Sequence, residues 1–170
     1  MTTSTDTGTV LTASGRFGAV ATTDYLEHVG IPYELLQHRP TFRAADEAAA
    51  TGIPPHLEAK TLIVKGTSGM MLVALPASER LSLTKLRPLV GDHSVRFARE
   101  GEISSAFPHF DVGAMPPLGA LASVPLVMDE RLFGLERVTC SAGDHRHSLV
   151  LCPADLAERL CPLVGDVCED

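Results

Sequence analysis

Short apolar runs separated by turn-forming residues predict a chain of alternating helices and strands. Apolar and β-branched residues fill segments 60–65 and 71–75, and the glycine-bearing segment 66–69 between them predicts a hairpin. Segment 41–52 is rich in alanine, carries acidic residues early and ends at a glycine, which is typical of a helix. The same signals predict further helices at 24–29, 83–90 with an interruption at Pro88, 100–106 and 154–160, and further strands at 32–37, 94–97, 124–128, 135–140 and 148–151.

These elements interleave, but the connections between strands are too short and irregular for a doubly wound sheet. We therefore predict an α+β fold in which a mixed, curved β-sheet is surrounded by helices. Residues 1–20 are rich in Thr, Ser and Gly and are expected to form a disordered tail. Residues 21–170 are long enough for a single domain with its own core, and no repeat or linker divides them.

The composition argues against several classes of protein. No apolar run reaches the roughly 18–20 residues of a membrane span, and no signal peptide is recognisable, so we expect a cytoplasmic protein with no membrane partner. The chain has no P-loop, no G-x-S-x-G motif and no dinucleotide fingerprint. The four cysteines include no C-x-x-C pair and are predicted to be reduced thiols: Cys140, Cys152, Cys161 and Cys168.

The formal net charge of −7 at first argues against a nucleic-acid partner, and DNA is not expected as one. The charge is unevenly distributed, however, because window 60–99 has a net charge of +5 and the rest of the chain sums to −12. A basic face on an acidic body can dock phosphate groups. A set of solvated surface charges explains the same pattern, and charge alone does not choose between the two.

Two local features are candidates for chemistry. Lys60 opens an apolar strand, where a lysine either extends into solvent or supplies a fixed charge to a ligand. The second feature is the 113–119 loop, Gly-Ala-Met-Pro-Pro-Leu-Gly, in which two prolines stiffen the backbone and two glycines permit close approach of a ligand. Such a loop is either a rigid turn or a frame that directs the amides of Gly113, Ala114 and Met115 at an oxyanion.

Three histidines are weaker candidates. His145 and His147 lie two residues apart, a spacing that can suggest a metal site, but no acidic or cysteine partner at a recognisable spacing supports one. No metal is therefore expected, and a polar substrate contact by one of the two is the functional alternative to a solvated loop. His38 ends a predicted strand and is either structural or a substrate contact.

Several short motifs follow one another in a recognisable order. They are a helix and strand ending in His38 (25–38), DEAAATGI (46–53), AKTL (59–62), Gly-x-x-Pro-Pro-x-Gly (113–119), Val-Pro-x-x-x-Asp-Glu (124–130), Ser-Ala-Gly-Asp-His (141–145) and Pro-x-Asp-Leu (153–156). This order resembles the YbaK/EbsC family, which includes the editing domain inserted in bacterial prolyl-tRNA synthetases. The similarity covers residues 24–166.

The resemblance implies a domain that hydrolyses the ester of mischarged tRNA, either tRNA(Pro) or a tRNA carrying another small amino acid, without a metal or organic cofactor. It implies the 3′ end of mischarged tRNA as a partner and an aminoacyl-tRNA synthetase as a further candidate. The implied catalytic residues are Lys60, Gly113 and Ala114. The implied substrate-binding residues are His38, Thr41, Met115, Pro116, Leu118, Gly119, Gly143 and His147, the last in preference to His145.

Met115 departs from the family pattern, because many relatives carry Ser or Thr before the first proline of the loop, and this leaves the preferred amino acid open. We expect Lys60 to supply a fixed positive charge and the loop amides to stabilise the oxyanion while water attacks. Two alternatives remain open. One is a non-catalytic module that binds tRNA or a synthetase, and the other is a hydrolase of another small activated acyl compound, such as a thioester.

Overall fold

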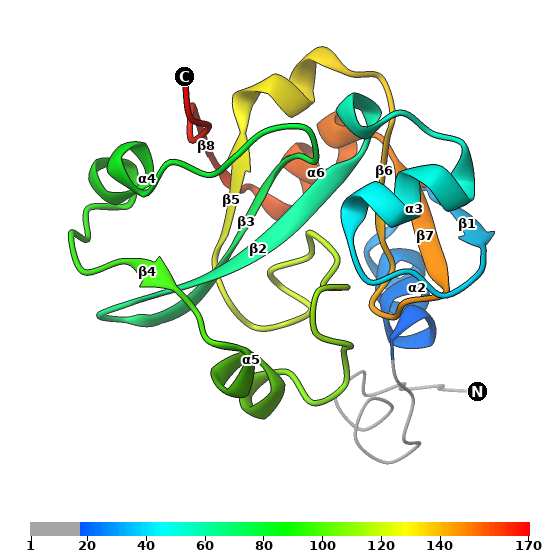
Figure 1. Ribbon diagram of the computed structural model, residues 1–170, viewed down its shortest axis with the longest axis horizontal. Coiled ribbons are helices and arrows are strands. Elements are labelled where there is room, and N and C mark those ends of the chain that lie inside the picture. The colour runs from blue at the N-terminus through cyan, green and yellow to red at the C-terminus, as the bar shows by residue number, and fades with distance from the viewer. Residues whose placement is uncertain (1–17) are drawn as a thin grey trace, which may run out of the picture.

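The computed structural model describes residues 18–170 and contains two β-sheets with helices packed around them (Figure 1). Five strands form the larger sheet in the order β4-β2-β3-β5-β8, and three form the smaller sheet in the order β1-β7-β6. The strands are β1 (Glu34–Gln37), β2 (Ala59–Gly66), β3 (Gly69–Pro76), β4 (Arg96–Phe97), β5 (Leu126–Asp129), β6 (Val138–Ser141), β7 (His147–Leu151) and β8 (Leu163–Gly165). The predicted α+β class and mixed sheet are confirmed.

The larger sheet is built on the predicted hairpin of β2 and β3, which pair antiparallel along their whole length. Gly69 closes the turn with φ 121°, a conformation that glycine adopts without steric cost. β5 runs parallel to β3 and β8 runs parallel to β5, so the sheet is mixed. On the other edge, β4 pairs with β2 only at Val64 and Lys65. The first residues of β2, 59–62, line a pocket together with Gly113 and Met115.

The smaller sheet is antiparallel, with β7 between β1 and β6. A single bridge between Glu58 and Thr139 connects it to the larger sheet. The strands therefore form two sheets, the larger of them mixed as predicted, and the bridge joins β6 to the segment that enters β2. The junction of the two sheets is where the candidate site forms.

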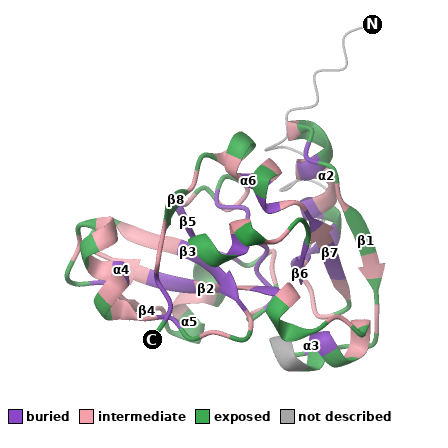
Figure 2. Ribbon diagram, turned by 90° about the horizontal axis from the view of Figure 1, so that it is seen from above, coloured by how far each residue is buried: buried purple, intermediate pink, exposed green. Residues whose placement is uncertain are grey.

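Two hydrophobic cores lie on opposite faces of the larger sheet. Residues of β2 alternate between them, because successive side chains of a strand point to opposite faces. Ala59 and Ile63 belong to the core shared with the smaller sheet, whereas Val64 belongs to the core beneath α4. Figure 2 shows the buried stretches of β2 and β3 between these layers. Burying both faces fixes the register of β2 and so fixes which of its residues reach the site.

The helices agree with the sequence in position and differ in extent. They are α2 (Ala19–Val29), α3 (Ala44–Thr51), α4 (Leu83–Val90), α5 (Glu100–Ala106) and α6 (Pro153–Leu160), with short 3₁₀ turns η1 (Pro55–Leu57) and η2 (Glu130–Gly134). α2 begins at Ala19, inside the expected tail; the remainder of that tail, 1–17, lies outside the described residues. α4 continues through Pro88 rather than being interrupted there, and Gly91 ends it in a left-handed conformation.

The C-terminal segment completes the sheet, which the sequence did not predict. β8 adds a strand beside β5, and Cys168 forms a bridge with Leu81. Val167 and Cys168 are fully buried in the core beneath α4. Among the described residues, no helix is long and apolar enough to cross a membrane.

Candidate active site

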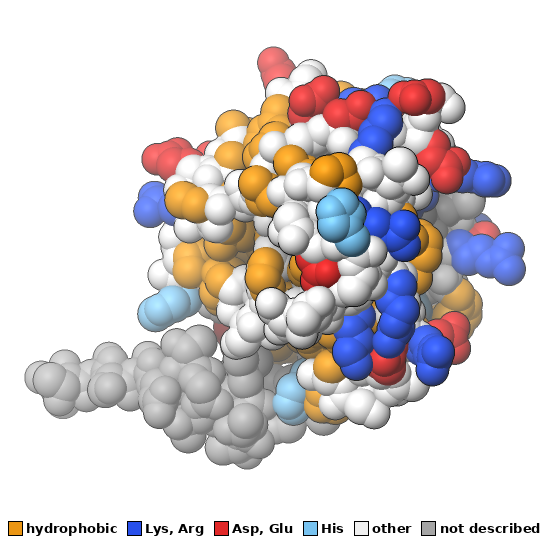
Figure 3. All heavy atoms as spheres, turned by 90° about the vertical axis from the view of Figure 1, so that its left-hand side faces the viewer, with side chains coloured by type: hydrophobic (Ala, Val, Ile, Leu, Met, Phe, Trp, Pro, Cys, Tyr) orange, Lys and Arg blue, Asp and Glu red, His pale blue; other side chains and the backbone are white. Residues whose placement is uncertain are grey.

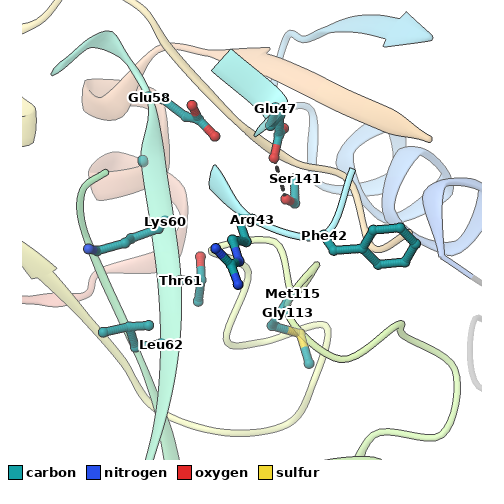
Figure 4. Close-up of a pocket in the computed structure, with 11 residues that line it drawn as sticks. Phe42, Arg43, Glu47, Glu58, Lys60, Thr61, Leu62, Gly113, Met115 and Ser141 are labelled. Carbon is teal, nitrogen blue, oxygen red and sulfur yellow. Dashed lines mark hydrogen bonds between the residues drawn. The ribbon is translucent and has the colours of Figure 1, made fainter. Parts of the chain in front are cut away.

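A pocket of about 160 Å³ lies at the junction of the two sheets (Figure 4). Its walls come from the segment that enters α3, the beginning of β2, the 113–119 loop and the end of β6. The lining residues are Phe42, Arg43, Glu47, Glu58, Ala59, Lys60, Thr61, Leu62, Gly113, Met115 and Ser141. The fold thus brings together four segments that are far apart in the sequence.

Two carboxyl groups lie at the buried end of this pocket. Glu47 is 4% exposed and Glu58 is 1% exposed, and Figure 4 shows the Glu58 carboxyl directed toward Glu47. Glu47 accepts a hydrogen bond from Ser141 Oγ at 2.8 Å and another from Ser148 Oγ. Glu58 Oε2 has no hydrogen-bond partner among residues 18–170. The pocket therefore contains one carboxyl group with its hydrogen bonds made and one with an acceptor oxygen unused.

The electrostatic surroundings of Glu58 favour its neutral form. Burial raises the pKa of the Glu58 carboxyl to about 8, and the neighbouring Glu47 carboxyl adds to the rise. Near pH 7 most molecules therefore carry a proton on this group. Burial also raises the pKa of the Cys140 thiol well above its ordinary value, with both carboxyls contributing, so this thiol stays protonated.

Lys60 and Thr61 point to opposite sides of β2 (Figure 4). The Thr61 side chain lies on the pocket side beside Arg43, and its Oγ1 is buried with no hydrogen-bond partner among the residues described. Lys60 Nζ instead donates to the carbonyl oxygens of Glu79 and, at 3.4 Å, Ala77. Burial lowers the pKa of Lys60. The lysine thus borders the pocket through its position on β2, while its ammonium group is held behind the strand.

The 113–119 loop divides into a pocket-facing part and a packed part. Gly113 has φ 87° and lines the pocket together with the buried Met115. The Ala114 amide donates to Asp111 O at 3.0 Å, so it is occupied within the loop and does not serve as a ready oxyanion donor. The rest of the loop is buried and packs inward, as the positions of Pro116, Leu118 and Gly119 show.

The histidines fall at the margin of the site. His38 Nε2 lies 2.9 Å from Ser148 Oγ, the hydroxyl that donates to Glu47, so His38 reaches the carboxyl pair through a serine. His147 Nδ1 contacts the Asp144 carboxylate at 2.9 Å and does not line the pocket. The ring of His145 packs against Phe42, with centroids 4.7 Å apart, and Phe42 lines the pocket. His145 is thus in contact with a pocket residue, although the sequence favoured His147.

Two further predicted contacts are structural in position. Thr41 is buried and its amide donates to His145 O at 2.8 Å, which ties the approach to α3 against the loop after β6. Gly143 has φ 109°, and a Cβ there would lie 2.9 Å from the backbone of Gly18. Neither residue lines the pocket; both hold the segments that do.

Three of the seven basic residues in window 60–99 form ion pairs with acids from outside it. Lys65 and Arg96 both bind Glu102, and Lys85 binds Asp166 and Asp170. Figure 3 shows basic and acidic side chains intermixed on the face that carries α4 and β4. This face is therefore not a uniformly basic surface. The observation favours solvated, ion-paired surface charges over a basic face that docks phosphate groups.

Of the predicted site residues, the structure brings Lys60, Gly113 and Met115 together at one pocket. The sequence analysis missed Glu47 and Glu58. An acidic residue in the first turn of a helix, such as Glu47, is common and does not by itself indicate a site. Glu58 precedes an apolar strand, where a solvent-exposed glutamate is equally common. A carboxylate on the apolar side of an alanine-rich helix is the one sequence signal that points to Glu47.

Comparison with known proteins identifies the family. The sequence profile of the aminoacyl-tRNA editing domain matches residues 38–158. Proline–tRNA ligase of Thermosipho melanesiensis is 31% identical over 96 residues, which cover 56% of this chain and 17% of the ligase. Proline–tRNA ligase of Fervidobacterium nodosum is 26% identical over 132 residues, which cover 74% of this chain and 23% of the ligase. The chain therefore spans about a fifth of the length of these curated relatives.

Solved structures agree in fold over nearly their whole length. The crystal structure of "hypothetical protein APE2540" superposes with a TM-score of 0.79 at 30% identity, covering 86% of this chain and 98% of that one. The crystal structure of "a putative trans-editing enzyme for prolyl tRNA synthetase" gives a TM-score of 0.79 at 27% identity, covering 89% and 97%. The family expected from the motif order is confirmed: the chain belongs to the aminoacyl-tRNA editing domain family.

Proposed function

We propose that this chain hydrolyses the ester bond of mischarged aminoacyl-tRNA, acting in trans on tRNA that a synthetase has released. The observation that carries the proposal is the small polar pocket between β2, α3 and the 113–119 loop, in a chain of the editing family. Support for action in trans comes from the similarity to a protein described as a trans-editing enzyme, 97% of which is covered by the match.

The size of the pocket supports a small amino acid as the substrate. Its volume of about 160 Å³ equals roughly five molecules of liquid water. The buried Met115 side chain forms part of the wall and limits the space for larger residues. Discrimination of one methylene by a pocket reaches only about 10- to 200-fold, so a second hydrolytic check has value after aminoacylation.

The rim of the pocket supports a single-stranded RNA end as the other half of the substrate. Phe42 is 70% exposed and lies against the His145 ring, and Arg43 lines the same rim. Within residues 18–170, Arg43 makes no ion pair. Proteins that bind single-stranded nucleic acid combine an exposed aromatic ring, on which a base stacks, with basic side chains for the phosphates. We assign this rim to the 3′-terminal nucleotides of tRNA.

The chemistry needs positioning more than a strong nucleophile, because an aminoacyl ester is already activated. Water forms the new bond to the carbonyl carbon, the ester bond to the ribose oxygen breaks, and a proton ends on that oxygen. Since the Ala114 amide is engaged by Asp111, the Gly113 and Met115 amides are the loop donors we assign to the carbonyl oxygen. The proposed reaction uses neither a metal ion nor an organic cofactor.

We assign Lys60 to a phosphate of the terminal nucleotide, an assignment that requires its ammonium group to turn from behind β2 toward the rim of the pocket. Its ammonium group donates to the Ala77 and Glu79 carbonyls, which are neutral acceptors. A phosphate is a stronger acceptor for a cation than a carbonyl, so exchange of partners on substrate binding is favourable. The cytoplasm, where tRNA is charged, is the expected site of action, and a synthetase is the candidate protein partner.

The test is deacylation of a panel of mischarged tRNAs, including Ala-, Cys- and Ser-tRNA(Pro), by the wild-type chain, Lys60→Ala and Lys65→Ala. Lys65 lies on the same strand but pairs with Glu102, so it is the matched control. We expect hydrolysis of at least one substrate, loss of it in Lys60→Ala and retention in Lys65→Ala. Binding of tRNA or a synthetase with no hydrolysis across the panel would instead assign a non-catalytic module, and hydrolysis of a small thioester alone would assign an acyl hydrolase.

A further inference from the structure

The paired carboxyl groups of Glu47 and Glu58 have no part in the chemistry described so far. Both are more than nine-tenths buried, yet both line the pocket. Placing two acids in one buried site raises the energy of the site unless a proton or a cation lies between them. Ser141 and Ser148 donate hydrogen bonds to Glu47, whereas burial and the neighbouring Glu47 carboxyl keep Glu58 protonated near neutral pH.

No cationic side chain among residues 18–170 forms an ion pair with either carboxyl, and the ammonium group of Lys60 lies behind β2. Arg43 faces the pocket, but Figure 4 shows its guanidinium beside Thr61 rather than at the carboxyl pair. The compensation for the carboxyl pair is therefore the proton on Glu58, which a ligand cation can replace.

The acceptors fit a primary ammonium group better than a metal ion. Glu58 Oε2 and Thr61 Oγ1 are buried and unpartnered among the described residues, and both residues line the pocket. No cluster of three or more metal-ligating side chains lies within 18–170. An ammonium group has three N–H donors, so it can donate to the Glu58 carboxylate and still bond other acceptors of the pocket.

We propose that Glu58, supported by Glu47 and Thr61, binds the α-ammonium group of the aminoacyl ester. This inference rests on the proposed function and names the part of the substrate that the acidic end of the pocket recognises. It makes a free α-amino group a requirement of the reaction. Peptidyl-tRNA and N-acylated aminoacyl-tRNA lack that group and are thereby excluded.

The proton balance follows from the surroundings of Glu58. The groups that face it are Glu47 from α3 and Cys140 from β6, while His38 reaches Glu47 through Ser148 and the Arg43 guanidinium lies beside Thr61. Since the pKa of Glu58 is about 8, the carboxyl holds a proton near neutral pH when no ligand is bound. Binding of an ammonium group ionises Glu58 and releases this proton to solvent.

The experiment compares Ala-tRNA(Pro) with N-acetyl-Ala-tRNA(Pro), or the corresponding pair for whichever substrate of the panel is hydrolysed. The wild-type chain is expected to prefer the free amine by about 100-fold or more in kcat/KM. Glu58→Gln keeps the shape but removes the charge, and it should lower kcat/KM for the free amine by about 10- to 100-fold. It should change hydrolysis of the N-acetyl substrate by less than about threefold, and the exposed-site control Glu100→Gln should change neither.

Each outcome decides between the two proposals. Equal hydrolysis of the two substrates by the wild-type chain would overturn the ammonium subsite and leave the deacylase standing. So would an unchanged preference in Glu58→Gln. Absence of hydrolysis of every free-amine substrate would overturn the proposed function itself. Should Glu58→Gln not fold, the wild-type comparison and Thr61→Val, which replaces the hydroxyl by a methyl group, provide the test. If Thr61→Val keeps the full preference for the free amine, Thr61 is not part of the subsite.

Discussion

The Asp129 carboxylate accepts a hydrogen bond from the Val167 amide at 2.9 Å, and this bond ties the C-terminal segment to the end of β5. Asp129 is fully buried and also binds Arg131. Replacing it by alanine removes these bonds and leaves the buried amide without a partner. We expect Asp129→Ala to lower the free energy of unfolding by about 3 kcal/mol.

Urea denaturation monitored by circular dichroism measures this loss. The neighbouring Glu130 is exposed, and Glu130→Ala serves as the control with an expected change below about 0.5 kcal/mol. Equal stability of the two variants would mean that the C-terminal segment contributes little to the fold.

Gly119→Ala tests the packing that positions the loop of the site. A Cβ at this position would lie 2.5 Å from Val124 O, so the backbone at the end of the loop must move. We expect a loss of about 1–3 kcal/mol in stability, with a fall in deacylation because Gly113 and Met115 move with the loop. Gly134→Ala is the matched control, since no atom lies within 4 Å of a Cβ placed there. Thermal unfolding and activity of both variants, measured side by side, decide the matter.

The raised pKa of Glu58 predicts how the stability of the chain depends on pH. Its pKa is raised from 4.5 to about 8, so the folded state binds more protons than the unfolded state between these values. The stabilising contribution of the proton is complete below about pH 4.5 and is lost as pH rises through 8. The free energy of unfolding of the wild-type chain should fall, relative to that of Glu58→Gln, by on the order of 5 kcal/mol across this window.

Urea midpoints of the two proteins at about pH 5, 6, 7 and 8, a range within the window set by Glu58, provide the measurement. Parallel pH profiles for the two proteins would show that the Glu58 carboxyl is not held neutral in the folded state. The comparison also controls for the other titrating groups nearby, because both proteins retain Glu47, Cys140 and Arg43.

Phe42→Ala tests the assignment of the pocket rim. Stacking of a base on an aromatic side chain contributes about 1–3 kcal/mol, so removal of the exposed ring should raise KM for aminoacyl-tRNA by about 5- to 150-fold. Hydrolysis of a small aminoacyl ester that lacks the nucleotides should be unaffected. The control is Leu163→Ala, which removes an exposed apolar side chain from β8, at the edge of the larger sheet opposite β4. An unchanged KM for tRNA would place the terminal nucleotides elsewhere.

Local signals in the sequence sufficed for the elements that depend on local interactions. The β2–β3 hairpin was predictable because Gly69 lies in its turn, and α3 was predictable because Gly52 ends it. Both glycines have positive φ. β8 was not predictable, because it is three residues long and its partner β5 lies far away in the sequence. The junction of the two sheets likewise depends on the single Glu58–Thr139 bridge, which joins residues far apart in the sequence and has no local signal.

The site shows the same limit. Lys60, Gly113 and Met115 belong to motifs that are legible in the sequence, and they meet at one pocket. The burial of Glu47 and Glu58 depends on α3, β2 and β6 packing against one another, so the raised pKa of Glu58 could not be read from its neighbours in the chain. The direction of the Lys60 side chain depends on the register of β2, which is set by both cores.

The four cysteines form a graded series of chemical reporters. Cys161 is exposed, Cys152 is partly covered, and Cys168 and Cys140 are buried under different layers of the fold. A thiol reagent should therefore label Cys161 first, whereas labelling of Cys168 requires release of the C-terminal segment. Cys140 lies beside the carboxyl pair, so its labelling rate measures how often the floor of the pocket opens. The native cysteines thus report separately on the opening of the C-terminal segment and of the pocket floor, and no cysteine has to be introduced.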